Sequence, residues 1–167
     1  MTYIFRIAAV VAALFFLNAP CFAVDAATVI EAKRTTLGLY LTSEEVPPFL
    51  VERRGHDIFV DVRMPEELAA TGVATLVDAN VPLLTLSADA KPQPNPDFVA
   101  GVSSRLAAKG LGKDDVVVLI CQTGRRSARA ANLLAASGFS HVYSVVDGFS
   151  GDGAGGWKNN GLPWRQS

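Results

Sequence analysis

The stretch that decides the fold is residues 116–127, VVVLICQTGRRS. Its first five residues form an unbroken apolar run, which is typical of a strand buried on both faces of a parallel sheet. A helix is expected over about 126–137, because small and apolar residues recur on one face and Gly138 follows as a stop. A strand that runs through a short loop into a helix is the building unit of α/β proteins.

The same alternation continues on both sides of this stretch. Strands are expected at 39–41, 58–62, 81–86 and 142–146, and helices at about 43–54, 64–70 and 96–109. Thr42 or Ser43 would cap the first of these helices, with Glu44 and Glu45 in its first turn. Residues 91–96, KPQPNP, are expected to form a surface loop, and so is the glycine-rich stretch 148–156. The sequence therefore predicts one α/β domain with a mainly parallel sheet.

The first 23 residues, MTYIFRIAAVVAALFFLNAPCFA, have the layout of a secretory signal peptide. Arg6 gives a positive start, residues 7–17 are apolar, and Cys21 and Ala23 are the small residues of a cleavage site. The apolar run is shorter than the ~20 residues that a membrane-spanning helix needs. A lipid anchor on Cys21 fits less well, because Pro20 precedes it. We therefore predict cleavage after Ala23, a periplasmic or secreted location, and no membrane span after cleavage.

Cleavage would change what the composition means. The chain has 167 residues, is half hydrophobic and carries a formal charge of −1. Without residues 1–23 the charge is −2, which gives no electrostatic reason to expect nucleic acid. We divide the chain into a signal peptide (1–23), a loosely attached lead-in (24–37) and one domain (38–166). That mature chain holds a single cysteine, Cys121, in a compartment where thiols normally pair or oxidise.

Cys121 begins the loop that joins the predicted strand to the predicted helix. Backbone N–H groups and the helix dipole favour an anion there, so the sulfur should be held largely as thiolate. Gly124 permits backbone angles that a side chain would oppose. Arg125 and Arg126 supply cations for a small oxyanion such as thiosulfate, and the sequence does not say which faces inward. Ser127 either hydrogen-bonds the sulfur or simply occupies the first turn.

Other polar residues are expected to support this loop. Gln122 and Thr123 should contribute backbone N–H groups rather than side-chain chemistry. Asp61 and Arg63 end a predicted strand at the same edge of the sheet, as an ion pair or a loop anchor. The two histidines, His56 and His141, lack metal-ligand spacing, so we expect no metal.

Three stretches together resemble the rhodanese family of sulfurtransferases. CQTGRRS is similar to the family's active-site loop of Cys, two residues, Gly, then Arg and Ser or Ala. IFVDVRMPEEL (58–68) resembles its Asp-Val-Arg strand end with an acidic helix. VYSVVDGF (142–149) with GWKNNGLPW (156–164) resembles its C-terminal signature.

The resemblance implies a five-stranded, mainly parallel sheet with helices on both faces. It implies sulfur transfer through a Cys121 persulfide, from thiosulfate or a persulfide donor to a thiol or cyanide acceptor, without a metal or organic cofactor. The partners would be a small sulfur-containing anion and a thiol, or a protein that gives or takes a persulfide.

Two departures from the family pattern affect the rim of the site. VDANVPL (77–83) stands where the family has His-Ile-Pro-Gly-Ala, and SGDGAGG (150–156) enlarges the last loop. The donor therefore stays open, as do the acceptor, the pathway and the oligomeric state.

Three alternative functions are weighed against sulfur transfer. A cysteine-dependent phosphatase or arsenate reductase places Arg six residues after Cys, whereas here that position is Ser127 and the arginine is one residue earlier. The other two are a non-catalytic rhodanese module that binds a partner and a carrier that passes on a persulfide received from another enzyme.

Overall fold

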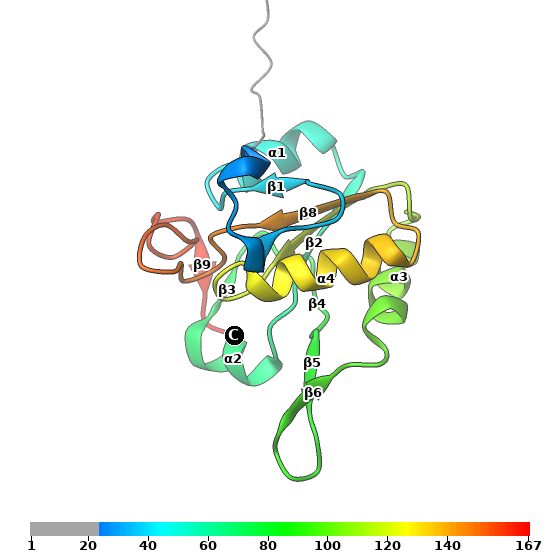
Figure 1. The fold of residues 1–167 in the computed structure, drawn as a ribbon, viewed down its shortest axis with the longest axis vertical. Coiled ribbons are helices and arrows are strands. Elements are labelled where there is room, and N and C mark those ends of the chain that lie inside the picture. Colours follow the sequence, from blue (N-terminus) through cyan, green and yellow to red (C-terminus); the bar gives the residue numbers. More distant parts are fainter. Residues whose placement is uncertain (1–23) are drawn as a thin grey trace, which may run out of the picture.

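The computed structural model describes residues 24–167, which fold around a five-stranded parallel sheet (Figure 1). The strand order is β1-β8-β7-β2-β4. These strands span Tyr40–Leu41 (β1), Asp57–Asp61 (β2), Ala79–Asn80 (β4), Val116–Ile120 (β7) and His141–Val145 (β8). The helices span Val46–Arg53 (α1), Pro65–Thr71 (α2), Phe98–Ala108 (α3) and Arg125–Ala136 (α4). The α/β class and the parallel sheet predicted from the sequence are confirmed.

Alternate residues of the central strand β7 pack against different helices. Val117 and Leu119 belong to a buried cluster with apolar residues of α3 and α4. Val118 and Ile120 belong to a second cluster with residues of α1 and of the C-terminal segment. Because successive strand residues point to opposite faces, the two clusters lie on opposite faces of the sheet. Helices therefore cover both faces, which explains why β7 is apolar throughout.

Helix α1 starts later than its predicted caps. Its N-cap is Glu45, and Pro47 lies within its first turn. The Glu45 carboxylate accepts a hydrogen bond from the Thr42 backbone N–H at 2.7 Å, so it orders the turn before the helix. A proline has no N–H to donate and is tolerated in the first turn, which explains the later start. The expectation of a Thr42 or Ser43 cap with both glutamates inside the helix is therefore wrong.

A two-stranded hairpin replaces most of one predicted strand and part of a predicted loop. Its strands are β5 (Leu84–Leu86) and β6 (Pro92–Pro94), paired antiparallel, and Figure 1 shows it extending from the β4 edge of the molecule. The Ser87 N–H bonds the Lys91 carbonyl, so the residues of the Leu86–Pro92 pair turn their backbone polar groups outward. Prolines occupy the β6 positions whose N–H would otherwise face solvent.

The C-terminal segment forms another small sheet that the sequence did not indicate. Strands β3 (Val73–Ala74) and β9 (Trp164–Arg165) pair antiparallel. Trp157 is fully buried in the core beside Phe59, as expected of a packing residue, whereas Trp164 is 41% exposed. The two tryptophans therefore differ in role.

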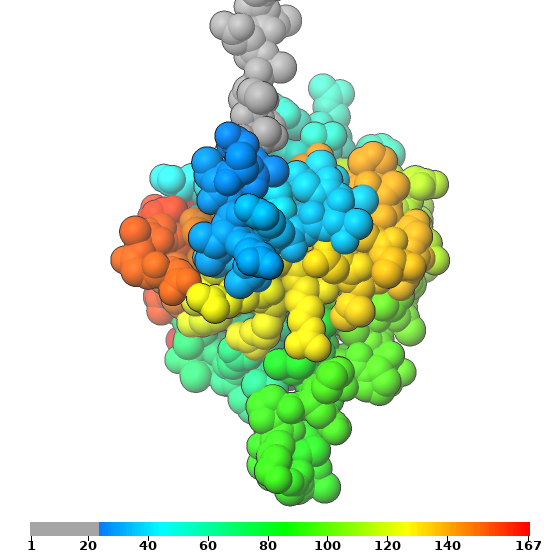
Figure 2. Space-filling model, in the orientation of Figure 1, coloured from blue at the N-terminus to red at the C-terminus, as the bar shows by residue number. Residues whose placement is uncertain are grey.

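The lead-in, residues 24–37, lies against α4 (Figure 2). It contains two short 3-10 helices, Ala26–Thr28 and Glu31–Lys33. The Asn132 side chain of α4 accepts hydrogen bonds from the backbone N–H and hydroxyl of Thr36 and donates one to the Arg34 carbonyl. The lead-in is thus held more firmly than the sequence suggested.

The predicted signal peptide, residues 1–23, lies outside the described residues. From residue 24 onward, the helices are all too short or too polar to cross a bilayer.

Candidate active site

Cys121 directly follows β7 and lies at the carboxyl edge of the parallel sheet, where α/β proteins bind ligands. The residue is 1% exposed. The segment after β8 holds the loop from behind: the Phe149 N–H donates to the Cys121 carbonyl at 2.8 Å, and the Ser150 N–H donates to the Gln122 carbonyl at 3.0 Å. Two successive backbone carbonyls of the loop, those of Cys121 and Gln122, are therefore fixed by this segment.

The Cys121 sulfur has two polar neighbours. It accepts a hydrogen bond from the Gly124 backbone N–H at 3.2 Å, and it lies 3.7 Å from the Ser127 hydroxyl oxygen. Gly124 is the N-cap of α4, so the sulfur lies at the positive end of the helix dipole. This placement favours negative charge on sulfur, whether as a thiolate or as a persulfide anion.

Two glycines allow the loop to approach its neighbours closely. A Cβ on Gly124 would lie 2.1 Å from the Val146 carbonyl oxygen, and its φ of +91° disfavours any side chain. A Cβ on Gly148 would lie 2.7 Å from backbone atoms of Gln122 and Thr123. The loop and the segment after β8 therefore pack backbone against backbone.

A pair of buried hydroxyl groups lies behind the sulfur. Ser144 on β8 and Ser127 on α4 are both completely buried. The Ser144 hydroxyl donates to the Ser127 oxygen at 2.9 Å, and the Ser127 hydroxyl donates to the Gly124 carbonyl at 3.0 Å. Sequence reasoning missed Ser144. A hydroxyl in the otherwise apolar strand VYSVV was the available signal, because a buried strand hydroxyl needs a partner.

Arg126 faces the interior and pairs with helix α2. Its guanidinium forms a bidentate pair with the Glu67 carboxylate at 2.6 and 2.5 Å. Hydrogen bonding to Glu67 raises the pKa of Arg126, and the Cys121 and Asp61 charges add to the effect. The same bond lowers the pKa of Glu67. Arg125 instead is 60% exposed and lies 3.7 Å from Asp152, so the inward arginine is Arg126.

Asp61 and Arg63 form an ion pair at 2.6 Å that is completely buried. Arg63 also donates to the Gln122 side-chain carbonyl at 3.2 Å and stacks on the Phe149 ring. The Gln122 amide in turn donates to the Ser150 hydroxyl at 2.7 Å. Gln122 therefore also ties the loop to two neighbouring segments through its side chain.

The remaining candidates lie apart from the sulfur or add little to it. The backbone of Thr123 lies against Gly148. His56 is mostly exposed beside Asp115, and His141 bonds the Asp114 carbonyl at the opposite edge of the sheet. Among residues 24–167, no three His, Cys, Asp or Glu side chains gather as metal ligands would. The chemistry that this arrangement can perform is that of a nucleophilic sulfur in an anion-stabilising loop.

Comparisons with known proteins show which family this chain is similar to. The rhodanese-like domain model matches residues 50–153. A chloroplastic thiosulfate sulfurtransferase of Arabidopsis thaliana is 35% identical over 107 residues, which are 64% of this chain and 78% of that protein. The RP600 protein of Rickettsia prowazekii is 32% identical over 107 residues, which are 64% of this chain and 80% of that protein.

Solved structures show the same fold. The crystal structure of Rv0390 from M. tuberculosis superposes with a TM-score of 0.62 at 29% identity, covering 77% of this chain and 97% of that one. A polysulfide-sulfur transferase homodimer from Wolinella succinogenes has a TM-score of 0.52 at 24% identity, covering 80% and 81%. The protein described here belongs to the rhodanese-like domain family, a family of sulfurtransferases.

Proposed function

We propose that the protein transfers a sulfane sulfur atom through a persulfide on Cys121. The observation that carries this proposal is the buried sulfur, which accepts the Gly124 N–H at the start of α4. The same donor serves the thiolate before the reaction and the persulfide after it.

In the first half-reaction the Cys121 thiolate attacks the sulfane sulfur of the donor. With thiosulfate, a bond forms between the two sulfurs while the bond to the sulfite sulfur breaks. The electron pair leaves with sulfite, and Cys121 carries a persulfide anion. Charge is conserved without a proton, an oxidant or a cofactor.

In the second half-reaction an acceptor attacks the outer sulfur of the persulfide. Cyanide gives thiocyanate, and a thiolate gives a new persulfide; in both cases the electron pair of the broken bond returns to Cys121 as thiolate. The thiosulfate sulfurtransferase among the relatives supports sulfur transfer of this kind.

The pairing of the arginines supports a persulfide as the better donor. The two inward arginines, Arg63 and Arg126, are paired with Asp61 and Glu67, respectively. A site whose cations are already neutralised attracts a dianion such as thiosulfate less than one with a free cation. The bidentate bond of Arg126 to Glu67 also disfavours a phosphatase, because this arginine would have to clamp the phosphoryl group.

The experiment is a comparison of two donors with one cysteine variant. The purified protein, incubated with thiosulfate or with glutathione persulfide, should gain the mass of one sulfur on the Cys121 peptide, and cyanide should release it as thiocyanate. Cys121→Ser should abolish both signals with either donor, whereas Ser103→Ala, on the remote helix α3, should not affect them.

Each outcome separates the candidate functions. Turnover by Cys121→Ser would overturn the catalytic assignment. A protein that gains no sulfur from either donor would be a non-catalytic binding module instead. A clear preference for glutathione persulfide over thiosulfate would support the role of a persulfide carrier.

We also propose that the protein acts outside the cytoplasm, because residues 1–23 have the pattern of a secretory signal. N-terminal sequencing of the protein recovered from the periplasm or the medium should begin at or near Val24. Recovery of the full-length chain in the cytoplasm would contradict this location.

A further inference from the structure

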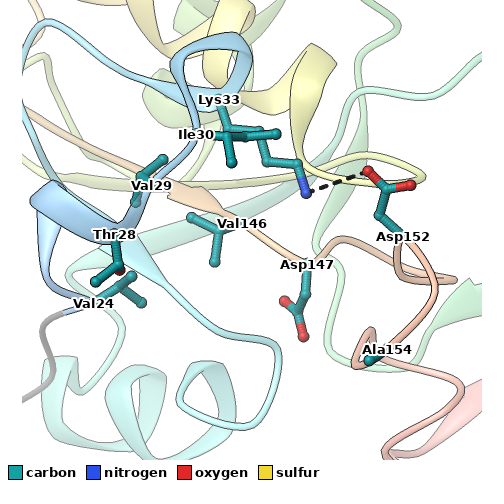
Figure 3. Close-up of a pocket in the computed structure, with 9 residues that line it drawn as sticks. All are labelled: Val24, Thr28, Val29, Ile30, Lys33, Val146, Asp147, Asp152 and Ala154. Atoms are coloured by element: carbon teal, nitrogen blue, oxygen red, sulfur yellow. Dashed lines mark ion pairs between the residues drawn. The ribbon is translucent and has the colours of Figure 1, made fainter.

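A pocket of about 260 Å³ lies between the lead-in and the glycine-rich loop after β8 (Figure 3). Its apolar wall is formed by Val24, Val29, Ile30, Val146 and Ala154, and its charged side chains are Lys33, Asp147 and Asp152. This volume is slightly below the usual range for drug-sized ligands, so it suits a small molecule. The combination of an apolar wall with a few charged groups is typical of a ligand site.

The Lys33 ammonium group lacks a close partner. Its side chain is only 12% exposed, and its nearest carboxylate oxygen, on Asp152, is 3.9 Å away. That distance is beyond hydrogen-bonding range, and within residues 24–167 the Lys33 ammonium makes no hydrogen bond. An ammonium group has three donors, and here none of them has an acceptor from residues 24–167 within hydrogen-bonding distance. An acceptor inside the pocket would supply one.

Asp147 cannot serve as that acceptor. Its carboxylate already accepts bonds from the Ser43 N–H, the Ser43 hydroxyl and the Gly156 N–H, at 2.8, 2.6 and 2.8 Å. Figure 3 shows the Asp147 carboxylate pointing away from the Lys33 ammonium. Its role is to hold the ends of the loop together.

Asp152 is a weakly held counter-ion shared by two cations. Its carboxylate is half exposed and lies 3.9 Å from Lys33 and 3.7 Å from Arg125. Neither contact is a hydrogen bond. Glycines with positive φ make up much of the loop that carries Asp152. Lys33 and Arg125 thus share this one carboxylate, while the other carboxylate of the pocket, Asp147, is held by its three hydrogen-bond donors.

We propose that this pocket binds a small organic monoanion. The anionic head would accept hydrogen bonds from Lys33, and a short apolar tail would lie against Val29 and Val146. The ligand would replace Asp152 as the counter-ion of Lys33 and leave Asp152 to Arg125. Cys121 does not line the pocket, so this ligand site is independent of the proposed function.

The pocket shares a wall with the active-site loop. Val146, which lines the pocket, places its carbonyl oxygen against Gly124. The ligand would therefore lie behind the loop that carries Cys121.

The test uses butyrate as the probe, with butyramide and butylamine as neutral and cationic analogues. Titration followed by NMR should show saturable shifts of the Lys33, Val146 and Ala154 amides with butyrate alone. Lys33→Met should weaken butyrate binding about tenfold or more, because it removes the one cation that residues 24–167 contribute to the pocket lining. Asp152→Asn should tighten binding severalfold, because the competing carboxylate is gone.

The matched controls are Lys91→Met and Asp89→Asn, which alter an exposed pair on the hairpin and should leave binding unchanged. The inference is overturned if butyrate gives no saturable shifts, if butyramide binds equally well, or if Lys33→Met binds butyrate normally. Weaker butyrate binding by Asp152→Asn, or binding of butylamine in place of butyrate, would reveal a cation site and overturn it as well.

Discussion

At Cys121, the arrangement of donors around one sulfur atom limits where each hydroxyl proton can go. Ser144 donates to the Ser127 oxygen, the Ser127 hydroxyl donates to the Gly124 carbonyl, and the Cys121 sulfur donates to the Ser127 oxygen at 3.7 Å. An anionic sulfur has no proton to donate, so it would compete with the Gly124 carbonyl for the Ser127 proton. A negatively charged sulfur is the stronger acceptor of the two. Ser144, which reaches the sulfur only through the Ser127 hydroxyl, thereby helps to stabilise the anion.

We expect Ser144→Ala to slow alkylation of Cys121 by iodoacetamide at neutral pH by about 2- to 10-fold, the equivalent of one hydrogen bond. Ser127→Ala should have a similar effect, and the double variant should be little worse than either, because the two hydroxyls act in series. Ser103→Ala, which removes a hydroxyl bonded within α3, is the control. Additive effects of the two site substitutions would contradict the coupling.

A substitution at Gly124 tests the close packing of the loop. Gly124→Ala should lower the free energy of unfolding by at least about 3 kcal/mol, since it adds a clash with the Val146 carbonyl to an unfavourable φ. Gly38 has a φ of +65° with open space around it, so Gly38→Ala should cost only about 1 kcal/mol. Urea denaturation of both variants measures the difference, and equal losses would show that backbone angle alone matters.

At the scale of elements, the pair of Glu67 and Arg126 fastens α2 to the start of α4. Glu67→Gln should lower the free energy of unfolding at neutral pH by about 1–2 kcal/mol, because both side chains are only about a quarter exposed. Glutamine can still accept the Met64 N–H that caps α2, so the loss reports on the ion pair. Glu66→Gln, which changes the neighbouring exposed residue, should leave stability unchanged.

The pH dependence of that loss has a definite sign. Arg126 holds the pKa of Glu67 below its ordinary value in the folded state. The stabilisation is therefore complete above the ordinary value and disappears as the pH falls through the lowered one. The difference between wild type and Glu67→Gln should vanish in acid, and a difference that persists there would contradict an ionic origin.

The sequence predicted those elements whose pattern is local. The apolar run of β7 is contiguous, and the glycine stop of α4, Gly138, lies two residues beyond the helix, so both signals are direct. The hairpin strand Pro92–Pro94 was missed, because proline argues against a strand unless an edge tolerates it. The strand pair β3 and β9 was missed because it joins segments about 90 residues apart.

The same distinction between local patterns and distant pairings applies to the residues of the site. The cysteine, the glycine and the arginines were found from their spacing along one loop. The partners that fix them were not found: Glu67 is 59 residues from Arg126, and Ser144 is 17 from Ser127. Pairing of this kind depends on which strands become neighbours, and only the folded sheet decides that.

For the molecule as a whole, the lead-in is part of the folded surface. Asn132→Ala removes the three hydrogen bonds that hold Arg34 and Thr36, so trypsin should cut after Lys33 or Arg34 severalfold faster. The digestion products followed over time by mass spectrometry provide the measurement. Leu133→Ala, at the neighbouring exposed position of α4, is the control, and equal cleavage of the two variants would mean that other contacts hold the lead-in.

The hairpin of β5 and β6 has a consequence for the protein at high concentration. A protruding strand normally offers its outward N–H groups to strands of other molecules, which is how many aggregates and fibrils begin. Pro92 and Pro94 have no N–H to offer along the β6 edge. The hairpin can therefore protrude in a crowded compartment without pairing with strands of other molecules along the β6 edge.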